Sequence, residues 1–271
     1  MVLLLFEVIE KQKKSVLRML NELKTYQQSL NIPLQKQNVK AKKYYFELVK
    51  DTNTEILEEI YLFRAIQFSR QFGISFANGR DHDAYDLTCQ HAILRDEWSN
   101  EIVAYTRVKF LYGDELHKSY SQQEFYLEHI FQDSDRIVEI GRTCVHLDYR
   151  SSRAVSILWA HIFNYYILNV RANYLIGCVS IKKFGNEENI YDTHQFIQQL
   201  PVNQSCNIQS KNIVEIACSL QNVSKKIKMP KLFDVYLKMN GKLSKQAYFD
   251  RDFNCLDYFV LMPVGEMRQN F

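Results

Sequence analysis

Glycine and proline are scarce in this chain, with 8 and 4 residues among 271. The scarcity argues against a nucleotide site built on a glycine-rich loop, and neither G-x-G-x-x-G nor a P-loop occurs. Long hydrophobic runs are also missing: the apolar stretch at residues 2–6 is too short for a signal peptide or a membrane span. The net charge of +3 is small, so we expect no nucleic-acid partner.

The six cysteines are scattered, and no C-x-x-C pair occurs, so the spacing typical of zinc sites and redox motifs is missing. Cys144, Cys178 and Cys255 lie in apolar runs, where a free thiol packs as a small hydrophobic group. The seven histidines show no paired ligand spacing, and we predict no metal and no bound cofactor. With no secretory signal visible, we expect reduced cysteines in a cytoplasmic protein.

Hydrophobic residues make up 46% of the chain, enough for a sizeable core. Apolar runs and alternation predict strands at 44–50, 90–97, 101–111, 136–146, 174–181 and 257–264. Helical spacing and apolar density predict helices at 54–72, 154–169 and 230–240, the last one stopped by Gly241. This order predicts an α/β fold with one mixed sheet and helices on its faces. We divide the chain into an N-terminal helical extension and linker at 1–40 and a single domain at 41–271.

The stretch 136–153, RIVEIGRTCVHLDYRSSR, carries charges inside a strand that otherwise looks buried. Side chains alternate between the faces of a regular strand, so Glu139 and Arg142 should point in opposite directions. A β-bulge at Gly141 would insert an extra residue and turn both charges to one side. A solvated edge strand with a structural ion pair explains the same residues, and spacing alone does not decide.

Six motifs in order carry a family resemblance: FRAIQF, DHDAYD, EIVAYTRV, EFYLEHIF, EIGRTCVHLDYR and LIGCVSI. Together with the tail after residue 230, they resemble acyl carrier protein-dependent N-acyltransferases of the GNAT superfamily. The chain is similar to ornithine–acyl carrier protein N-acyltransferases and long-chain N-acyl amino acid synthases, and more distantly to acyl-homoserine-lactone synthases. The resemblance spans about residues 44–265, and it implies a GNAT-like, mostly antiparallel central sheet flanked by helices.

The resemblance implies transfer of a long-chain (3-hydroxy)acyl group from acyl carrier protein to an amino-acid amine, with ornithine as the first acceptor to consider. The amine of an amino acid is mostly protonated at neutral pH, so the reaction needs a base. Glu139 is our candidate for that base, because GNAT donors lie beside this strand. Arg142 and Arg107 would orient Glu139 or hold the carboxylate of the acceptor, although strand-surface ion pairs are the plainer explanation.

Matching positions assign further residues to the substrate site. Asp83 and Asp86 would position a cationic acceptor or brace Arg64 and Arg107, and ordinary loop capping is equally open. Arg64 lies among apolar residues of a predicted helix, which favours a structural role. The remaining substrate-binding candidates are Phe68, Cys144, Val145 and His146, among which Cys144 is expected to pack rather than react and His146 to be structural.

GNAT enzymes that use acetyl-CoA usually carry R-x-x-G-x-G/A after this strand, whereas Arg150 to Val155 here lack both glycines. Acyl carrier protein has no adenosine pyrophosphate, so the loss fits a carrier-protein donor, although a degenerate CoA site would look the same. The carrier is acidic, and we assign its docking to Arg150, Arg153, Lys182 and Lys183. A second lysine cluster, at 225–231, or residues 1–30 would provide peripheral contact with the inner face of a membrane.

Two other functions stay open. One is a signal synthase of the acyl-homoserine-lactone type, which would need S-adenosylmethionine as the acceptor. The other is a non-enzymatic GNAT-fold module that binds acyl carrier protein, lipid or another protein. Acceptor, chain length and oligomeric state are not encoded in any motif that we recognise.

Overall fold

The computed structural model describes residues 43–50, 54–150, 152–182, 187–214, 216 and 231–266. The predicted extension at 1–40, Lys183 and most of the lysine cluster at 225–231 lie outside these residues. The described residues form two compact units. The first comprises those up to Arg70, those of Ser75–Lys109 and those of Gly141–Arg171; the second comprises Gln71–Ile74, Phe110–Ile140 and the described residues from Ala172 on.

Nine strands of the described residues form one mixed sheet, with the order β1-β2-β3-β5-β6-β11-β9-β7 and β10 paired to β11. The pairs β5–β6 and β7–β9 are parallel, and the other pairs with a known register are antiparallel. The predicted GNAT-like sheet, mixed and mostly antiparallel, is therefore confirmed. A separate two-stranded sheet pairs β4 with β8.

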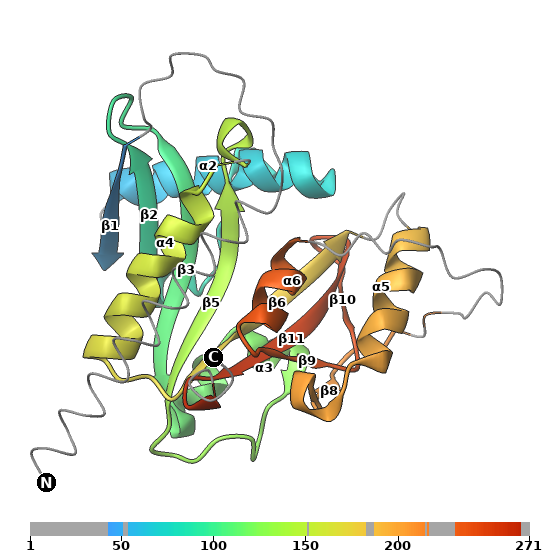
Figure 1. The fold of residues 1–271 in the computed structure, drawn as a ribbon. Helices are drawn as coiled ribbons and strands as arrows, with labels where there is room; N and C mark the ends of the chain where they lie inside the picture. The colour runs from blue at the N-terminus through green and yellow to red at the C-terminus, as the bar shows by residue number, and fades with distance from the viewer. Residues whose placement is uncertain are drawn as a thin grey trace, which may run out of the picture. The chain divides into compact units, whose positions relative to one another are not determined.

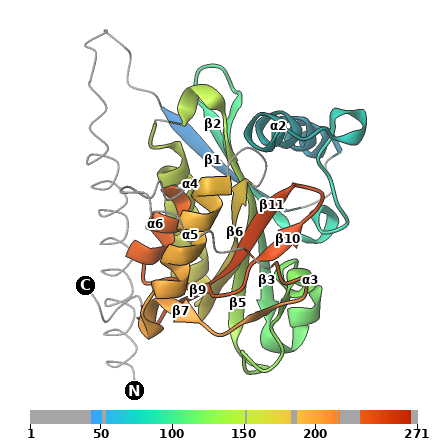
Figure 2. The same ribbon diagram turned by 90° about the vertical axis from the view of Figure 1, so that its right-hand side faces the viewer.

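The first unit contains β1 (Tyr44–Lys50), β2 (Gln90–Asp96), most of β3 (Ile102–Tyr112) and the second half of β5 (Arg136–Val145). Two helices, α2 (Thr54–Phe72) and α4 (Ala154–Phe163), lie on opposite faces of these strands (Figures 1 and 2). The sequence of α4 is apolar almost all round, as expected of a buried helix. Its Leu158, Trp159, Ile162 and Phe163 are fully buried. A π-helical turn, η5 (Asn164–Asn169), continues α4, so the predicted helix at 154–169 has two hydrogen-bonding patterns.

The second unit contains β6 (Tyr174–Lys182), β11 (Cys255–Pro263) and several short strands. The short helix α3 (Ser121–Glu124) lies on one face, and α5 (Glu187–Gln199) and α6 (Lys231–Lys238) lie on the other (Figure 2). Successive side chains of β11 point to opposite faces of the sheet. Phe259 packs against Phe125, just after α3, whereas Tyr258 packs against Phe233 of α6. The short strands are β4 (Phe125–Tyr126), β7 (Ser205–Cys206), β8 (Gln209–Ser210), β9 (Lys242–Ser244) and β10 (Tyr248–Asp250).

The long strands and helices predicted within the described residues form, whereas the short elements were not predicted. These are α3, the strands of two or three residues, and the 3₁₀ turns η1 (Ala77–Gly79), η2 (Asp86–Thr88), η3 (Gly113–Lys118), η4 (Leu147–Tyr149) and η6 (Val202–Gln204). Such elements have too few residues to show a period, so sequence patterns cannot reveal them. Within the described ranges, no helix combines the length and apolar character that crossing a membrane requires.

Candidate active site

Glu139 lies in the middle of β5 and is buried. Its two carboxylate oxygens accept hydrogen bonds from the backbone N–H groups of Tyr120, at 2.8 Å, and Ser121, at 2.7 Å. These are the first free N–H groups of α3, so Glu139 caps this one-turn helix from a neighbouring strand. The carboxylate is thus held in a fixed orientation, and each oxygen keeps a further lone pair for a substrate.

Arg142 lies three residues further along β5, within the first unit. Its guanidinium contacts Asp83, with Nη2 to Oδ2 at 3.1 Å, and lies 3.7 Å from Asp81. The backbone at Arg142 has a φ of +54°, which is rare for a residue with a side chain. The regular strand is therefore interrupted here, and the guanidinium of Arg142 is turned to the aspartates that follow η1.

The positive φ bears on the role suggested for Gly141. The left-handed conformation that glycine adopts most easily falls on Arg142 instead, and a bulge at Gly141 stays a prediction. A Cβ added to Gly141 would meet no heavy atom within 4 Å, so space does not demand glycine either. The ion contacts of Arg142 help to offset a backbone cost of about 1–2 kcal/mol for this conformation.

Three arginines and three aspartates form a buried network in the first unit. Arg64 of α2 contacts Asp81 at 2.8 Å and Asp86 at 2.6 Å. Arg107 of β3 contacts the same Asp86 at 2.9 Å and Asp83 at 2.5 Å. With Arg142 on Asp83, the charges balance within the network. The structure thus brings together the predicted residues Arg64, Asp83, Asp86, Arg107 and Arg142, and it pairs them with one another.

In this network, burial and the oppositely charged neighbours shift the pKa of a side chain in opposite directions. Burial alone raises the pKa of Asp86, but Arg64 and Arg107 outweigh it and lower the pKa to about 2. Burial likewise acts against the charge of Arg107, and Asp83 and Asp86 overcome it and raise the pKa of the guanidinium. Asp86 and Arg107 are consequently charged at neutral pH. Such a network orients Arg107 and Arg142 more rigidly than solvent-exposed ion pairs do.

The other substrate-site candidates lie in the first unit too. Phe68 is buried in α2, and Cys144 is buried in β5, where burial raises the pKa of its thiol. Val145 is half-buried. The Nδ1 atom of His146 accepts a hydrogen bond from the backbone N–H of Asp148 at 3.3 Å, which caps the η4 turn. Cys144 and His146 thus occupy structural environments, and their roles in binding substrate stay predictions.

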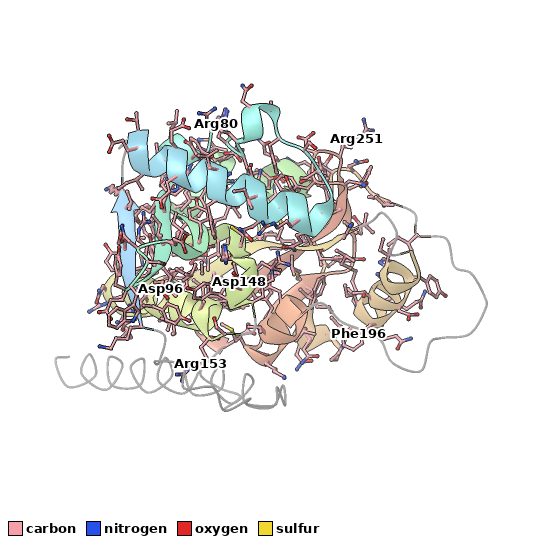
Figure 3. All side chains as sticks on the ribbon, turned by 90° about the horizontal axis from the view of Figure 1, so that it is seen from above. Arg80, Asp96, Asp148, Arg153, Phe196 and Arg251 are labelled. Atoms are coloured by element: carbon pink, nitrogen blue, oxygen red, sulfur yellow. The ribbon has the colours of Figure 1, made fainter. Side chains whose placement is uncertain are left out.

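The residues assigned to the carrier protein divide between the units. Arg150 and Arg153 are exposed in the first unit, just before α4. Arg153 is labelled in Figure 3. Lys182 is half-buried at the end of β6 in the second unit, with its Nζ 3.7 Å from the place a Cβ on Gly73 would take. Their contact with a carrier protein stays a prediction.

Several acidic residues that we did not predict lie together in the second unit. Glu124, Asp250 and Asp257 are buried. Asp250, Cys255 and Asp257 each have one atom that could bind a metal ion, and these three atoms lie within 4.8 Å of one another. The two aspartates belong to the tail used for the resemblance, but no sequence pattern connects them with Glu124. Only the pairing of β10, β11 and β6 beneath α3 brings these residues together.

Comparisons with known proteins identify what this chain is similar to. Residues 63–160 match the family model described as an acetyltransferase (GNAT) domain. The L-ornithine N(alpha)-acyltransferase of Rhodobacter capsulatus is 24% identical over 213 residues, which cover 72% of this chain and 79% of that protein. The enzyme of the same name from Brucella abortus is 22% identical over 223 residues, covering 75% of this chain and 77% of that protein. Among solved structures, the AHL synthase LasI has a TM-score of 0.47 at 11% identity, covering 83% of this chain and 91% of that chain.

The matched range 63–160 begins in α2 and ends in α4, so it contains Glu139 and the whole arginine–aspartate network. The relatives extend the match over most of the chain. The resemblance predicted from the motifs is confirmed: this chain carries a GNAT acetyltransferase domain, and it is an acyltransferase.

Proposed function

We propose that this protein moves a long acyl chain, with a 3-hydroxyacyl chain as the first candidate, from the thioester of acyl carrier protein to the amine of an amino acid. The product would be a lyso-aminolipid. The observation that carries the proposal is the match, over about three quarters of the chain, to two proteins named L-ornithine N(alpha)-acyltransferase. Ornithine is therefore the first acceptor to test.

Glu139 would act as the general base in this reaction. The amine nitrogen attacks the thioester carbonyl carbon, the C–S bond breaks, and the proton lost by the amine reaches the departing thiolate through Glu139. A base must be held within reach of its proton, and the two N–H bonds from Tyr120 and Ser121 fix the carboxylate in one place. The general base then contributes about 10²- to 10⁴-fold to the rate.

The start of α4 supports a carrier protein over CoA as the donor. A CoA pyrophosphate would need free N–H groups at a helix N-terminus. Here the N–H of Ala154 already donates to the hydroxyl of Ser152 at 3.1 Å, and that hydroxyl donates to the Tyr149 carbonyl at 2.6 Å. The exposed Arg150 and Arg153 beside it offer positive charge to an acidic carrier.

The test is mass spectrometry after the purified protein is incubated with C16 acyl carrier protein and a mixture of free amino acids. We expect one predominant N-acyl amino acid, N-acylornithine, and release of the carrier thiol in equal amount. Palmitoyl-CoA in place of the acyl carrier protein should give much less product. Binding of the carrier without any product, with S-adenosylmethionine also offered as acceptor, would contradict the proposal and favour a binding module.

A further inference from the structure

One face of the second unit's strands carries a row of acids and thiols. Residues opposite each other in antiparallel strands present their side chains on the same face. The register pairs β6 with β11 and β11 with β10, and so places on one face Cys178, Ser180, Lys182, Tyr248, Asp250, Cys255, Asp257 and Phe259. Lys182 adds a cation to this row, opposite Cys255, but it is not among the groups that act most strongly on Glu124. The Phe125 ring, 5.7 Å from that of Phe259, covers this face, and Glu124 immediately precedes it.

Glu124 is the unusual member of this group. It is only 2% exposed, and neither of its carboxylate oxygens has a hydrogen-bond partner among the described residues. The Cys178 thiol and the Tyr120 hydroxyl are its nearest donors and lower the pKa of Glu124, although neither meets the geometry of a regular hydrogen bond to its carboxylate. The other groups that act most strongly on Glu124 are two further carboxyls, Asp257 and Asp250, and none of these neighbours is a cation.

A buried carboxyl without a partner costs free energy, because it has given up its hydration and gained no protein hydrogen bond. Three carboxyls gathered in one place add mutual repulsion whenever more than one is ionised. A positively charged ligand that donates hydrogen bonds would remove both costs. An alkylammonium group has that chemistry, since it carries three N–H donors and no acceptor.

We propose that Glu124, together with Asp257 and Asp250, binds the side-chain ammonium of a diamino acid acceptor. This inference rests on the proposed function and names the acceptor class, since an amino acid with a neutral side chain has nothing to offer this cluster. Burial, followed by the Asp257 and Asp250 carboxyls, raises the pKa of Glu124 well above its ordinary value. Arrival of the ammonium favours the ionised form of Glu124 and turns the repulsion into attraction.

The position of α3 links this site to the proposed base. Glu139 binds the N–H groups of Tyr120 and Ser121 at the start of α3, and Glu124 is the last residue of the same helix. Four helical residues rise about 6 Å. An α-amine and a side-chain amine separated by three methylene groups span a similar length. One amine can therefore meet Glu139 while the other meets Glu124.

Details of the cluster favour an ammonium over a metal ion. The Oδ1 atom of Asp250 already accepts N–H bonds from Asp252 at 2.9 Å and Phe253 at 3.0 Å. Burial and the nearby aspartates raise the pKa of the Cys255 thiol, and a metal would need the thiolate. The charged residue between Asp250 and Asp252, Arg251, is exposed and projects outward (Figure 3).

The test compares ornithine with norvaline, which has the same carbon chain without the side-chain amine. We expect wild-type protein to prefer ornithine in kcat/KM, with acyl carrier protein as the donor. Glu124→Gln should lower the ratio of the two kcat/KM values about 10- to 100-fold, the worth of a charged hydrogen bond. The Kd of ornithine from calorimetry should rise by a similar factor. The matched control is Glu128→Gln, because Glu128 is exposed four residues away, and it should change nothing.

The outcomes separate this inference from the proposed function. If wild-type protein acylates both amino acids equally, or Glu124→Gln lowers both equally, the ammonium site is wrong although the acyltransferase reaction stands. If nothing is acylated, the proposed reaction fails, and calorimetry with ornithine and norvaline still decides the site. Elemental analysis that finds one zinc per chain in wild-type protein, and none in Glu124→Gln, would overturn the ammonium site in favour of a metal.

Discussion

The carboxylate of Glu139 caps α3 by accepting the backbone N–H of Ser121 at 2.7 Å. The base we propose for catalysis is therefore also a structural group, with a second N–H bond from Tyr120 at 2.8 Å. The two roles are compatible, because an ionised carboxylate can accept about four hydrogen bonds. They also mean that a loss of activity at this position needs a control for folding.

Glu139→Gln should keep a hydrogen bond to α3 and lose the base. We expect turnover to fall at least 100-fold, whereas the free energy of unfolding falls by only about 1–2 kcal/mol. Steady-state kinetics and urea unfolding on the same preparations measure both effects. The control is Glu139→Ala, which should lose more stability than Glu139→Gln at a similar loss of turnover. A folded Glu139→Gln variant with near-normal turnover would remove Glu139 from the mechanism.

Arg107 should contribute more to the free energy of unfolding than a strand-surface ion pair would. Its replacement by leucine leaves the buried Asp86 and the half-buried Asp83 without one of their cations, so we expect the free energy of unfolding to fall by about 3–5 kcal/mol. Thermal and urea unfolding measure this change. The control is Arg80→Leu, which breaks an exposed pair with Glu58 and should cost less than about 1 kcal/mol. Equal effects of the two variants would contradict the network's structural role.

The long elements could be predicted because they follow from local patterns. Alternation reveals β2 and β3, a nearly continuous apolar run reveals β6, and helical spacing reveals α2. Arg107 and Asp83 were identified only through the family resemblance. The contacts between distant residues could not be predicted. Glu139 contacts a helix of four residues, and Glu124 lies near Asp257. Both depend on strand register and on segments too short to show a period.

Asp86 makes the stability of the protein depend on pH in the acid range. Arg64 and Arg107 lower its pKa to about 2 against the effect of burial, from an ordinary value of 3.8. The ionised form is favoured by folding, so its stabilisation is complete above about pH 4 and is lost as the pH falls toward 2. We expect Asp86 to account for roughly 2 kcal/mol of this loss. In urea titrations, Asp86→Asn should be the less stable protein at pH 7, with the difference shrinking toward pH 2.

Two glycines of the strands should respond differently to alanine. A Cβ on Gly177 would lie 2.4 Å from the carbonyl oxygen of Ile140, where β5 and β6 pair, and the backbone would have to move. We expect Gly177→Ala to lower the free energy of unfolding by about 1–3 kcal/mol. Gly141→Ala meets no atom within 4 Å and should change it by less than about 0.5 kcal/mol. Equal losses would show that Gly141 has a conformational role not visible in its surroundings.

The Glu124→Gln substitution should stabilise the protein at high pH and lower its selectivity for ornithine. Its raised pKa, caused by burial and then by Asp257 and Asp250, means that the folded protein keeps a proton above the pH at which the unfolded chain releases it. Its contribution to stability is therefore greatest below its ordinary pKa and declines as the pH rises above it. Glu124→Gln removes this decline, so its melting temperature relative to wild type should be higher at pH 8 than at pH 4. Calorimetric melting at the two pH values measures the difference, and ornithine at pH 8 should raise the melting temperature of wild type more than that of Glu124→Gln. A pH-independent difference would mean that Glu124 already has a cationic partner in the folded protein, and the ammonium site would then be filled by the chain itself.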